Sequence, residues 1–244
     1  MRSELPGLLT GLRSPDPAVR DDHAYVRLAA LVPELDEAER LRLGDELAGR
    51  LGDPEVQARS FAALVLARLV EAGAHRAEWL AAFADWYPAE PDLRGYDPQM
   101  GWLHAAAHGA DLLAAFGRHP EVPPAPLLEL GVLRLLAPTG QVFDAMEDDR
   151  IGCALGVVLT REELTEREAL GWLDPVVAEF GRAEPGPVPP FASNTLRTLR
   201  VVYLLADRGV RPRGHQGDPL MLRHRAAVRE AVAGVLAIAA PYAG

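Results

Sequence analysis

Hydrophobic residues recur every three or four positions along almost the whole chain, which is the spacing of amphipathic helices. No convincing alternation of hydrophobic and polar residues predicts a strand, and no Asn-Gly pair predicts a tight hairpin. The pattern therefore predicts an all-α fold. The expected helices cover residues 3–12, 17–32, 36–50, 54–71, 75–87, 98–117, 125–136, 145–160, 165–180, 192–207 and 218–239.

Start signals accompany several of these helices. Asp16-Pro17 and Asp53-Pro54 each place an N-cap residue before a proline at the first helical position. Asp144 followed by Glu147 has the spacing of a capping box. These signals predict helices that begin near residues 17, 54 and 145.

An internal similarity bears on how the helices are arranged. Asp16-Pro-Ala-Val-Arg20 and Asp53-Pro-Glu-Val-Gln57 both open helices that continue with Ala and Leu at core spacing. The two segments are 37 residues apart. Helix-pair repeats of the HEAT and armadillo type recur every ~40–47 residues, which is close to this spacing. The sequence favours a HEAT-like or armadillo-like α-solenoid of paired antiparallel helices, a single helical-repeat domain spanning residues 1–244.

Composition and charge argue against several classes of protein. The chain has 244 residues, of which 49% are hydrophobic, and carries a net charge of −10 without a single lysine. Negative charge opposes binding to phosphate backbones and anionic membranes, so nucleic-acid binding is the least favoured alternative. The sequence contains neither a long uninterrupted apolar run nor a secretory signal, so we expect a cytoplasmic protein without membrane contact. Cys153, within an apolar run, is expected to be buried.

The densest chemistry lies between residues 90 and 113. His104, His108 and Asp111 are spaced four and three residues apart, so on the expected helix 98–117 they share one polar stripe beside the apolar face. In a solenoid this border position faces the concave groove, where such proteins bind partners. The stripe is the candidate centre of a site.

Three interpretations of this stripe remain open. His104, His108 and Asp111 can hold a divalent metal such as zinc with an open position for water, although the Glu of the zincin signature is missing. Without a metal, one imidazole can act as a general base that Asp111 orients. In the third interpretation the three side chains form a buried polar network that fixes helix register and does no chemistry.

Further polar and aromatic residues flank the stripe. Asp92, Arg94 and Tyr96 lie in the segment before it, where Arg94 is expected to pair with a carboxylate across the helix ends, and Trp102 adds aromatic surface. Downstream, Glu147 or Asp148 is a candidate to complete the constellation, although acidic residues in a first turn also suit the helix dipole. Asn194 is a candidate from a later helix, with Ser193 expected as its N-cap.

These motifs together resemble a bacterial family known only as a domain of unknown function, helical throughout and of similar length. The resemblance rests on Glu90-x-Asp-x-Arg-Gly-Tyr96, on Gly101-Trp-x-His-x-x-x-His-x-x-Asp111, on Glu147-Asp-x-Arg150 and on Asn194. It spans most of the chain, and its central Gly-Trp-x-His motif is specific. It implies that these positions form one signature around a shared groove, and it implies no activity.

The sequence therefore leaves two main functions open, and nucleic-acid binding is a third, less favoured alternative. The first is a ligand-binding or partner-binding protein whose concave polar and aromatic groove centres on His104, His108 and Asp111. The second is a hydrolase-type enzyme that uses the same residues, with or without a divalent metal. The sequence identifies neither a cofactor nor an oligomeric state.

Overall fold

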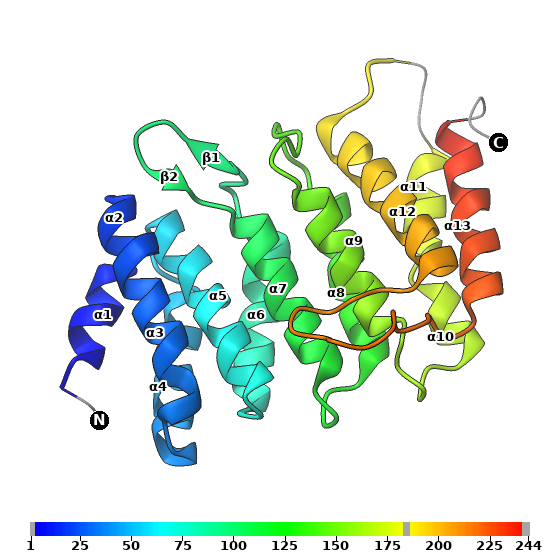
Figure 1. Ribbon diagram of the computed structural model, residues 1–244. Helices are drawn as coiled ribbons and strands as arrows, with labels where there is room; N and C mark the ends of the chain where they lie inside the picture. Colours follow the sequence, from blue (N-terminus) through cyan, green and yellow to red (C-terminus); the bar gives the residue numbers. More distant parts are fainter. Residues whose placement is uncertain (1–2, 183–185, 241–244) are drawn as a thin grey trace. The chain divides into compact units, whose positions relative to one another are not determined.

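The computed structural model describes residues 3–182 and 186–240, which are mostly helical (Figure 1). The chain forms two compact units, Met1–His119 and Pro120–Gly244. The single domain predicted for residues 1–244 stays a prediction. Within the described residues, every helix is too short or too polar to cross a membrane.

Unit 1 is built around one central helix. This helix, α5, is buried along nearly its whole length and packs against α7, α4 and α3. Figure 1 shows α3, α5 and α7 side by side. The elements of unit 1 are α1 (Leu5–Gly11), α2 (Pro17–Val19), the π-helix η1 (Arg20–Tyr25), α3 (Val26–Leu31), the 3-10 helix η2 (Val32–Glu34), α4 (Glu37–Arg50), α5 (Val56–Glu71), α6 (Ala77–Ala89), β1 (Tyr96–Asp97), β2 (Gly101–Trp102) and α7 (Ala105–Arg118).

Unit 2 is organised around α12, which packs against α8, α9 and α13. The helix α13 also contacts α10 and α11. The elements of unit 2 are α8 (Pro124–Leu136), α9 (Glu147–Val158), α10 (Glu166–Gly171), α11 (Asp174–Phe180), α12 (Pro190–Arg208) and α13 (Arg225–Ala239).

Close packing of α6 on α7 depends on one glycine. A Cβ atom on Gly109 would lie 2.1 Å from the ring of Tyr87, so no larger residue fits without displacing that ring. The Tyr87 hydroxyl donates to the Ala106 carbonyl at 2.9 Å. This contact brings the aromatic face of α6 against the backbone of α7, in line with the dense packing of protein interiors.

The internal similarity of the sequence corresponds to a repeated turn. Asp16 and Asp53 each accept a hydrogen bond from the amide two residues later, at 2.9 Å in both turns. Arg20 then donates to the carbonyls six and five residues before it, and Arg59 does the same in the second turn. Each turn is thus fastened by an arginine of the helix that follows, with the two arginines 39 positions apart.

Several expectations about the helices are wrong in detail. The expected helix 98–117 begins only at residue 105, because residues 96–102 form a hairpin in which Tyr96 pairs with Trp102. The expected helix 17–32 is helical throughout but contains the π-helical segment η1, whereas the expected helix 165–180 is interrupted between α10 and α11. Asp16 is an N-cap as predicted, but α5 begins two residues after the predicted Asp53-Pro54 start.

In unit 2, the predicted capping box of Asp144 and Glu147 does not form, since α9 is preceded by Met146 with a left-handed backbone. Ser193 lies inside α12 and is not its N-cap, because the helix begins earlier, at Pro190.

Cys153 is exposed and not buried. Partial desolvation raises the pKa of its thiol, which disfavours the nucleophilic thiolate.

Candidate functional site

The hairpin before α7 holds the motif residues of unit 1. Its strands pair Tyr96 with Trp102 and Asp97 with Gly101. Asp97 closes the turn by accepting the amides of Gln99 and Met100 at 2.9 Å each, and these two hydrogen bonds lower the pKa of its carboxyl. Gly101 has a φ of 71°, where other residues are strained, and a Cβ there would lie 3.0 Å from Pro17.

Arg20 fastens this hairpin to the start of unit 1. Its guanidinium donates to the carbonyls of Met100 at 2.7 Å and Trp102 at 3.1 Å. It also donates to the carbonyl of Ser14, in the turn before η1. The same group lies over the ring of Phe61, 4.9 Å from its centre, and its Nε is 2.7 Å from a carboxylate oxygen of Asp21. The side chain is fully buried. The Arg20 cation therefore holds the hairpin in place, and the carbonyls and the carboxylate that it contacts all belong to unit 1.

A second set of ion pairs orders the segment between α6 and the hairpin. Glu90 receives a bidentate pair from Arg59 at 2.7 and 2.6 Å, a 2.5 Å hydrogen bond from the Trp86 indole, and another from the Asp92 amide. Arg94 pairs with Asp92 at 2.6 Å and also with Asp97. The predicted carboxylate partner of Arg94 is thus present, but it lies in the same segment and not across helix ends.

His104 occupies a strained position at the start of α7. Its φ of 50° places the backbone in the left-handed region, which is uncommon for a residue with a side chain. Its ring stacks on Trp102 with centroids 4.5 Å apart and planes 3° from parallel. Tyr96 meets the same indole edge-on at 4.9 Å. His104 therefore belongs to an aromatic stack and not to a helical stripe, which corrects the expectation that all three stripe residues lie on one helix.

His108 is buried between α5 and α7. Its Nδ1 lies 2.8 Å from the hydroxyl of Ser60, which also donates to the carbonyl of Leu103. Phe61 packs edge-on against its ring at 5.0 Å. A hydroxyl has one proton, so when Ser60 donates it to Leu103, Nδ1 of His108 is the donor to Ser60. These contacts match the interpretation of His108 as part of a polar network that joins two helices.

The three stripe residues are near one another without forming a compact ligand set. The rings of His104 and His108 are 5.8 Å apart, and Asp111 is half-buried one turn further along α7. Among residues 3–182 and 186–240, this trio does not bring three donor atoms within 4.8 Å of one another. The geometry favours the two interpretations that need no metal.

One carboxylate that interacts with His104 is missing from the sequence predictions. Asp21, in the π-helix η1, interacts electrostatically with His104, and burial raises the pKa of its carboxyl despite the adjacent Arg20. No sequence signal joins two residues more than eighty positions apart. An imidazole near a carboxylate is also the arrangement that general acid-base chemistry uses.

The predicted site residues of unit 2 fasten a loop. Asn194 accepts from the amide of Phe143 at 2.9 Å and donates to the carbonyl of Gln141 at 3.0 Å. Asp148 pairs with Arg197 at 2.6 Å, and Glu147 accepts from the amide of Ala145 at 2.9 Å. Glu147, Asp148 and Asn194 are all buried. The hydrogen bonds of Asn194 and Glu147 hold residues 141–145 against α12 and α9.

The fold and this site define a mostly helical protein whose N-terminal unit presents a hairpin-borne aromatic and histidine surface. The chain belongs to the family described as "Protein of unknown function (DUF2785)", whose model matches residues 47–204. The match runs from the end of α4 into α12 and includes the hairpin, His104 and His108. Comparison with curated proteins and with solved structures finds no match.

The pairing of Arg94 with Asp92 leads to a pH prediction. Hydrogen bonds from the Arg94 side chain hold the pKa of the Asp92 carboxyl below its usual value. The stability that this pair contributes is therefore present above the ordinary carboxyl pKa of about 3.9 and is lost as the pH falls through the lowered folded value. We expect Arg94→Gln to raise the pKa of Asp92, measured by carboxyl carbon NMR.

The exposed Arg42 provides the control for this measurement. Arg42→Gln removes a positive charge from α4 and should leave the Asp92 titration unchanged. An Asp92 pKa that is the same in the Arg94→Gln variant as in the parent protein would contradict the assigned pairing.

Proposed function

We propose that this protein is a helical-repeat binding protein and that unit 1 binds an arginine-containing or lysine-containing segment of a partner protein. The binding surface consists of Tyr96, Trp102, His104 and Asp21, called the aromatic surface below. The observation that carries the proposal is the parallel stack of Trp102 on the strained His104, since it presents an indole in a fixed orientation at the protein surface.

Exposure distinguishes this surface from ordinary aromatic packing. Tyr96 is 56% exposed and Trp102 is 46% exposed, whereas Trp79, Trp86 and Trp172 are buried with their indole nitrogens hydrogen-bonded. Tyrosine and tryptophan dominate the binding energy of many protein interfaces. The hydrogen bonds from Arg20 hold the hairpin in place, so little conformational entropy is lost on binding.

The local charge selects a cationic partner. Asp21, which interacts electrostatically with His104, and the exposed Asp22 both lie on the π-helix η1, while the cations Arg20 and Arg94 are already paired with carboxylates. A guanidinium or ammonium over an indole or phenol ring is attracted by the ring and here also by these carboxylates. The net charge of −10 acts in the same direction at long range.

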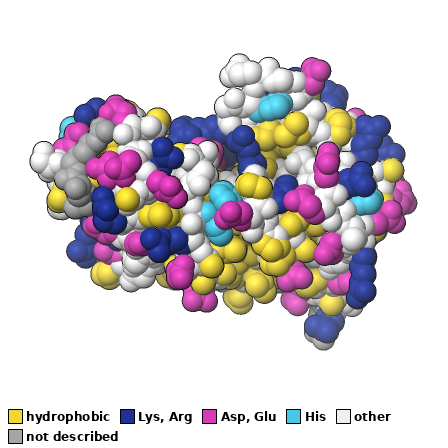
Figure 2. All heavy atoms as spheres, turned by 90° about the horizontal axis from the view of Figure 1, so that it is seen from below, with side chains coloured by type: hydrophobic (Ala, Val, Ile, Leu, Met, Phe, Trp, Pro, Cys, Tyr) yellow, Lys and Arg dark blue, Asp and Glu magenta, His cyan; other side chains and the backbone are white. Residues whose placement is uncertain are grey.

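The arrangement of paired helices supports the repeat part of the proposal. The aspartates of the two turns, Asp16 and Asp53, are 37 residues apart and the arginines that fasten the turns are 39 apart, both slightly below the ~40–47 residues of HEAT-type repeats. On the face seen in Figure 2, acidic and basic side chains are interspersed. Proteins that bind nucleic acids typically gather basic side chains in a stripe, so the nucleic-acid alternative remains the least favoured.

A second candidate function is a hydrolase-type enzyme. It is favoured by the electrostatic interaction of Asp21 with His104, since an imidazole and a carboxylate are groups that proton transfer uses. In its metal-dependent form His104, His108 and Asp111 would hold a divalent ion. Metal analysis of protein purified without a histidine tag tests that form, since stoichiometric metal that is lost in His108→Ala would support it and its absence would contradict it.

The binding proposal is tested with a defined peptide. A fluorescein-labelled Gly-Arg-Gly-Arg-Gly-Arg-Gly peptide is titrated with the protein and followed by fluorescence anisotropy. We expect Trp102→Ala to weaken binding by roughly tenfold or more, because the cation loses its ring contact. Tyr203→Ala removes a comparably exposed aromatic residue from unit 2 and should leave binding unchanged.

Two outcomes would contradict the proposal. One is equal binding of the matching peptide with glutamate in place of arginine, because the carboxylates of the aromatic surface should repel it. The other is binding of the arginine peptide that Trp102→Ala does not weaken.

A further inference from the structure

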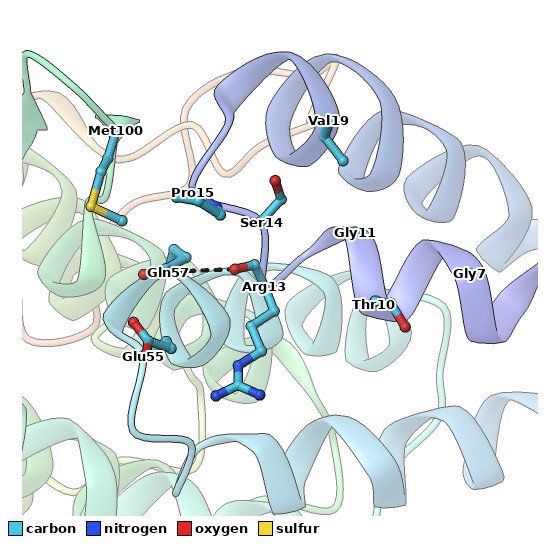
Figure 3. A pocket seen from close by; sticks show the side chains of 10 residues that line it. All are labelled: Gly7, Thr10, Gly11, Arg13, Ser14, Pro15, Val19, Glu55, Gln57 and Met100. Carbon is cyan, nitrogen blue, oxygen red and sulfur yellow. Dashed lines mark hydrogen bonds between the residues drawn. The ribbon is translucent and has the colours of Figure 1, made fainter.

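A cavity of about 790 Å³ opens in unit 1 below the hairpin turn. Figure 3 shows it between α1, the connection that follows α1, the first turn of α5 and the turn that carries Met100. Its volume lies within the range of about 300–1,000 Å³ that is usual for small-molecule sites. None of the residues of the aromatic surface lines it.

Gln57 presents an unused hydrogen-bond acceptor at this cavity. Its amide Nε2 donates to the Arg13 carbonyl at 3.0 Å, drawn as the dashed line in Figure 3. Its Oε1 is buried and has no hydrogen-bond partner among residues 3–182 and 186–240, and the residue is only 3% exposed. Exchanging the two amide atoms would set oxygen against the oxygen of Arg13, so the contact fixes which atom is the acceptor.

A buried acceptor without a donor costs free energy, because it has lost its hydrogen bonds to water without a replacement. A ligand that supplies an N–H or O–H removes that cost. The charged groups of the lining favour a cationic donor, because Arg13 is already 3.4 Å from the carboxylate of Asp53, whereas the Glu55 carboxylate forms no ion pair with any of the described residues. Glu55 lies at the start of α5, two residues before Gln57.

The remaining walls suit a hydrocarbon chain. Pro15, Val19 and Met100 contribute apolar side chains, and Gly7 and Gly11 expose backbone without a side chain. A Cβ atom on Gly7 would meet nothing within 4 Å, so the cavity is open at that wall. Burial of apolar carbon against such walls contributes about 25 cal/mol per Å².

We propose that this cavity binds a small organic amine whose ammonium group donates to Oε1 of Gln57 and is attracted by Glu55. The carbon chain of the amine lies along Pro15, Val19 and Met100. The site is independent of the peptide-binding proposal for the aromatic surface.

The probe for this proposal is n-butylamine, protonated at neutral pH, with n-butanol and butyrate as neutral and anionic controls of similar length. Binding to the full chain is followed by saturation-transfer NMR and by isothermal titration calorimetry. We expect butylammonium to bind more tightly than butanol, and butyrate not to bind. Butanol or butyrate binding as tightly as butylammonium would overturn the proposal.

Variants locate the binding and keep it separate from folding. Gly7→Leu fills the open wall and should abolish binding, while Gly49→Leu, at a similarly open position of α4, should not. Gln57→Met removes the acceptor at similar length and should weaken binding about tenfold, the equivalent of one hydrogen bond to a charged group. Glu55→Gln should weaken it several-fold and more so at low salt.

The melting temperature of each variant is measured beside its affinity. Gly7→Leu should retain the melting temperature of the parent protein, so a loss of binding there is a loss of the site. Binding that survives in both Gly7→Leu and Gln57→Met would show that the amine binds elsewhere, and no binding to the parent protein would show that the cavity holds only water. Either result overturns the proposal.

Discussion

Replacing Arg20 by alanine is expected to lower the free energy of unfolding by roughly 3–5 kcal/mol, the cost of removing one partner of a buried ion pair. The guanidinium is fully buried and donates to carbonyls on both sides, those of Ser14 and Pro15 and those of Met100 and Trp102. Alanine leaves these carbonyls without their donor and the Asp21 carboxylate without the cation of its ion pair. A loss of this size corresponds to a fall of roughly 10 °C or more in melting temperature.

Arg27→Ala is the matched control. Arg27 makes a bidentate pair with Glu4 at 3.0 Å, but both side chains are substantially exposed. Exposed pairs of this kind contribute little to stability, so urea denaturation should distinguish the two variants clearly. Similar losses for Arg20→Ala and Arg27→Ala would show that Arg20 does not hold the hairpin.

The second large effect is expected at Glu90. Glu90→Gln keeps the shape of the side chain but removes its charge, leaving the Arg59 guanidinium largely buried opposite a neutral amide. The amide must also replace an oxygen that accepts from Arg59 and Trp86. We expect a loss of roughly 3–5 kcal/mol in the free energy of unfolding, measured by urea denaturation.

Glu71→Gln serves as the control for Glu90. Glu71 pairs with Arg68 at 2.7 Å on α5, but both side chains are about one quarter exposed and can exchange the contact for water. Its loss should be about 1 kcal/mol or less. If Glu90→Gln were as mild as Glu71→Gln, the ion pair with Arg59 would contribute little to the order of the segment before the hairpin.

The helical class and the approximate positions of the helices follow from hydrophobic periodicity. The hairpin at residues 96–102 does not, because strands of two residues are too short to show an alternating pattern. It is stabilised by hydrogen bonds from Arg20, some eighty positions away. Contacts between residues so far apart leave no local pattern in the sequence. The hydrophobic periodicity therefore predicts a helix from residue 98, whereas α7 begins at Ala105.

The residues of the candidate site are arranged differently from the stripe that the sequence predicts. The approach of His104 to His108 and the carboxylate partner of Arg94 agree with the sequence predictions. Helical angles do not predict the stack of His104 on Trp102, because His104 lies before the first residue of α7. Asp21 was missed because its approach to His104 depends on how η1 packs in unit 1.

Glu147, Asp148 and Asn194 illustrate what residue type alone cannot resolve. Acidic and amide side chains near a helix start suit a binding site and a loop clamp equally well. In unit 2 their hydrogen bonds go to the backbone of residues 141–145 and to Arg197. Their membership of one groove with His104, His108 and Asp111 stays a prediction.

The central claim is that the aromatic surface binds a cationic segment, and the indole signals of the four tryptophans test it most directly. Their indole N–H resonances are followed in nitrogen-15 NMR spectra as the Gly-Arg-Gly-Arg-Gly-Arg-Gly peptide is added. Trp102 is exposed, whereas Trp79, Trp86 and Trp172 are buried. We predict that the Trp102 signal shifts saturably while the signals of the buried three stay in place. A Trp102 signal that does not move at saturating peptide would contradict the claim.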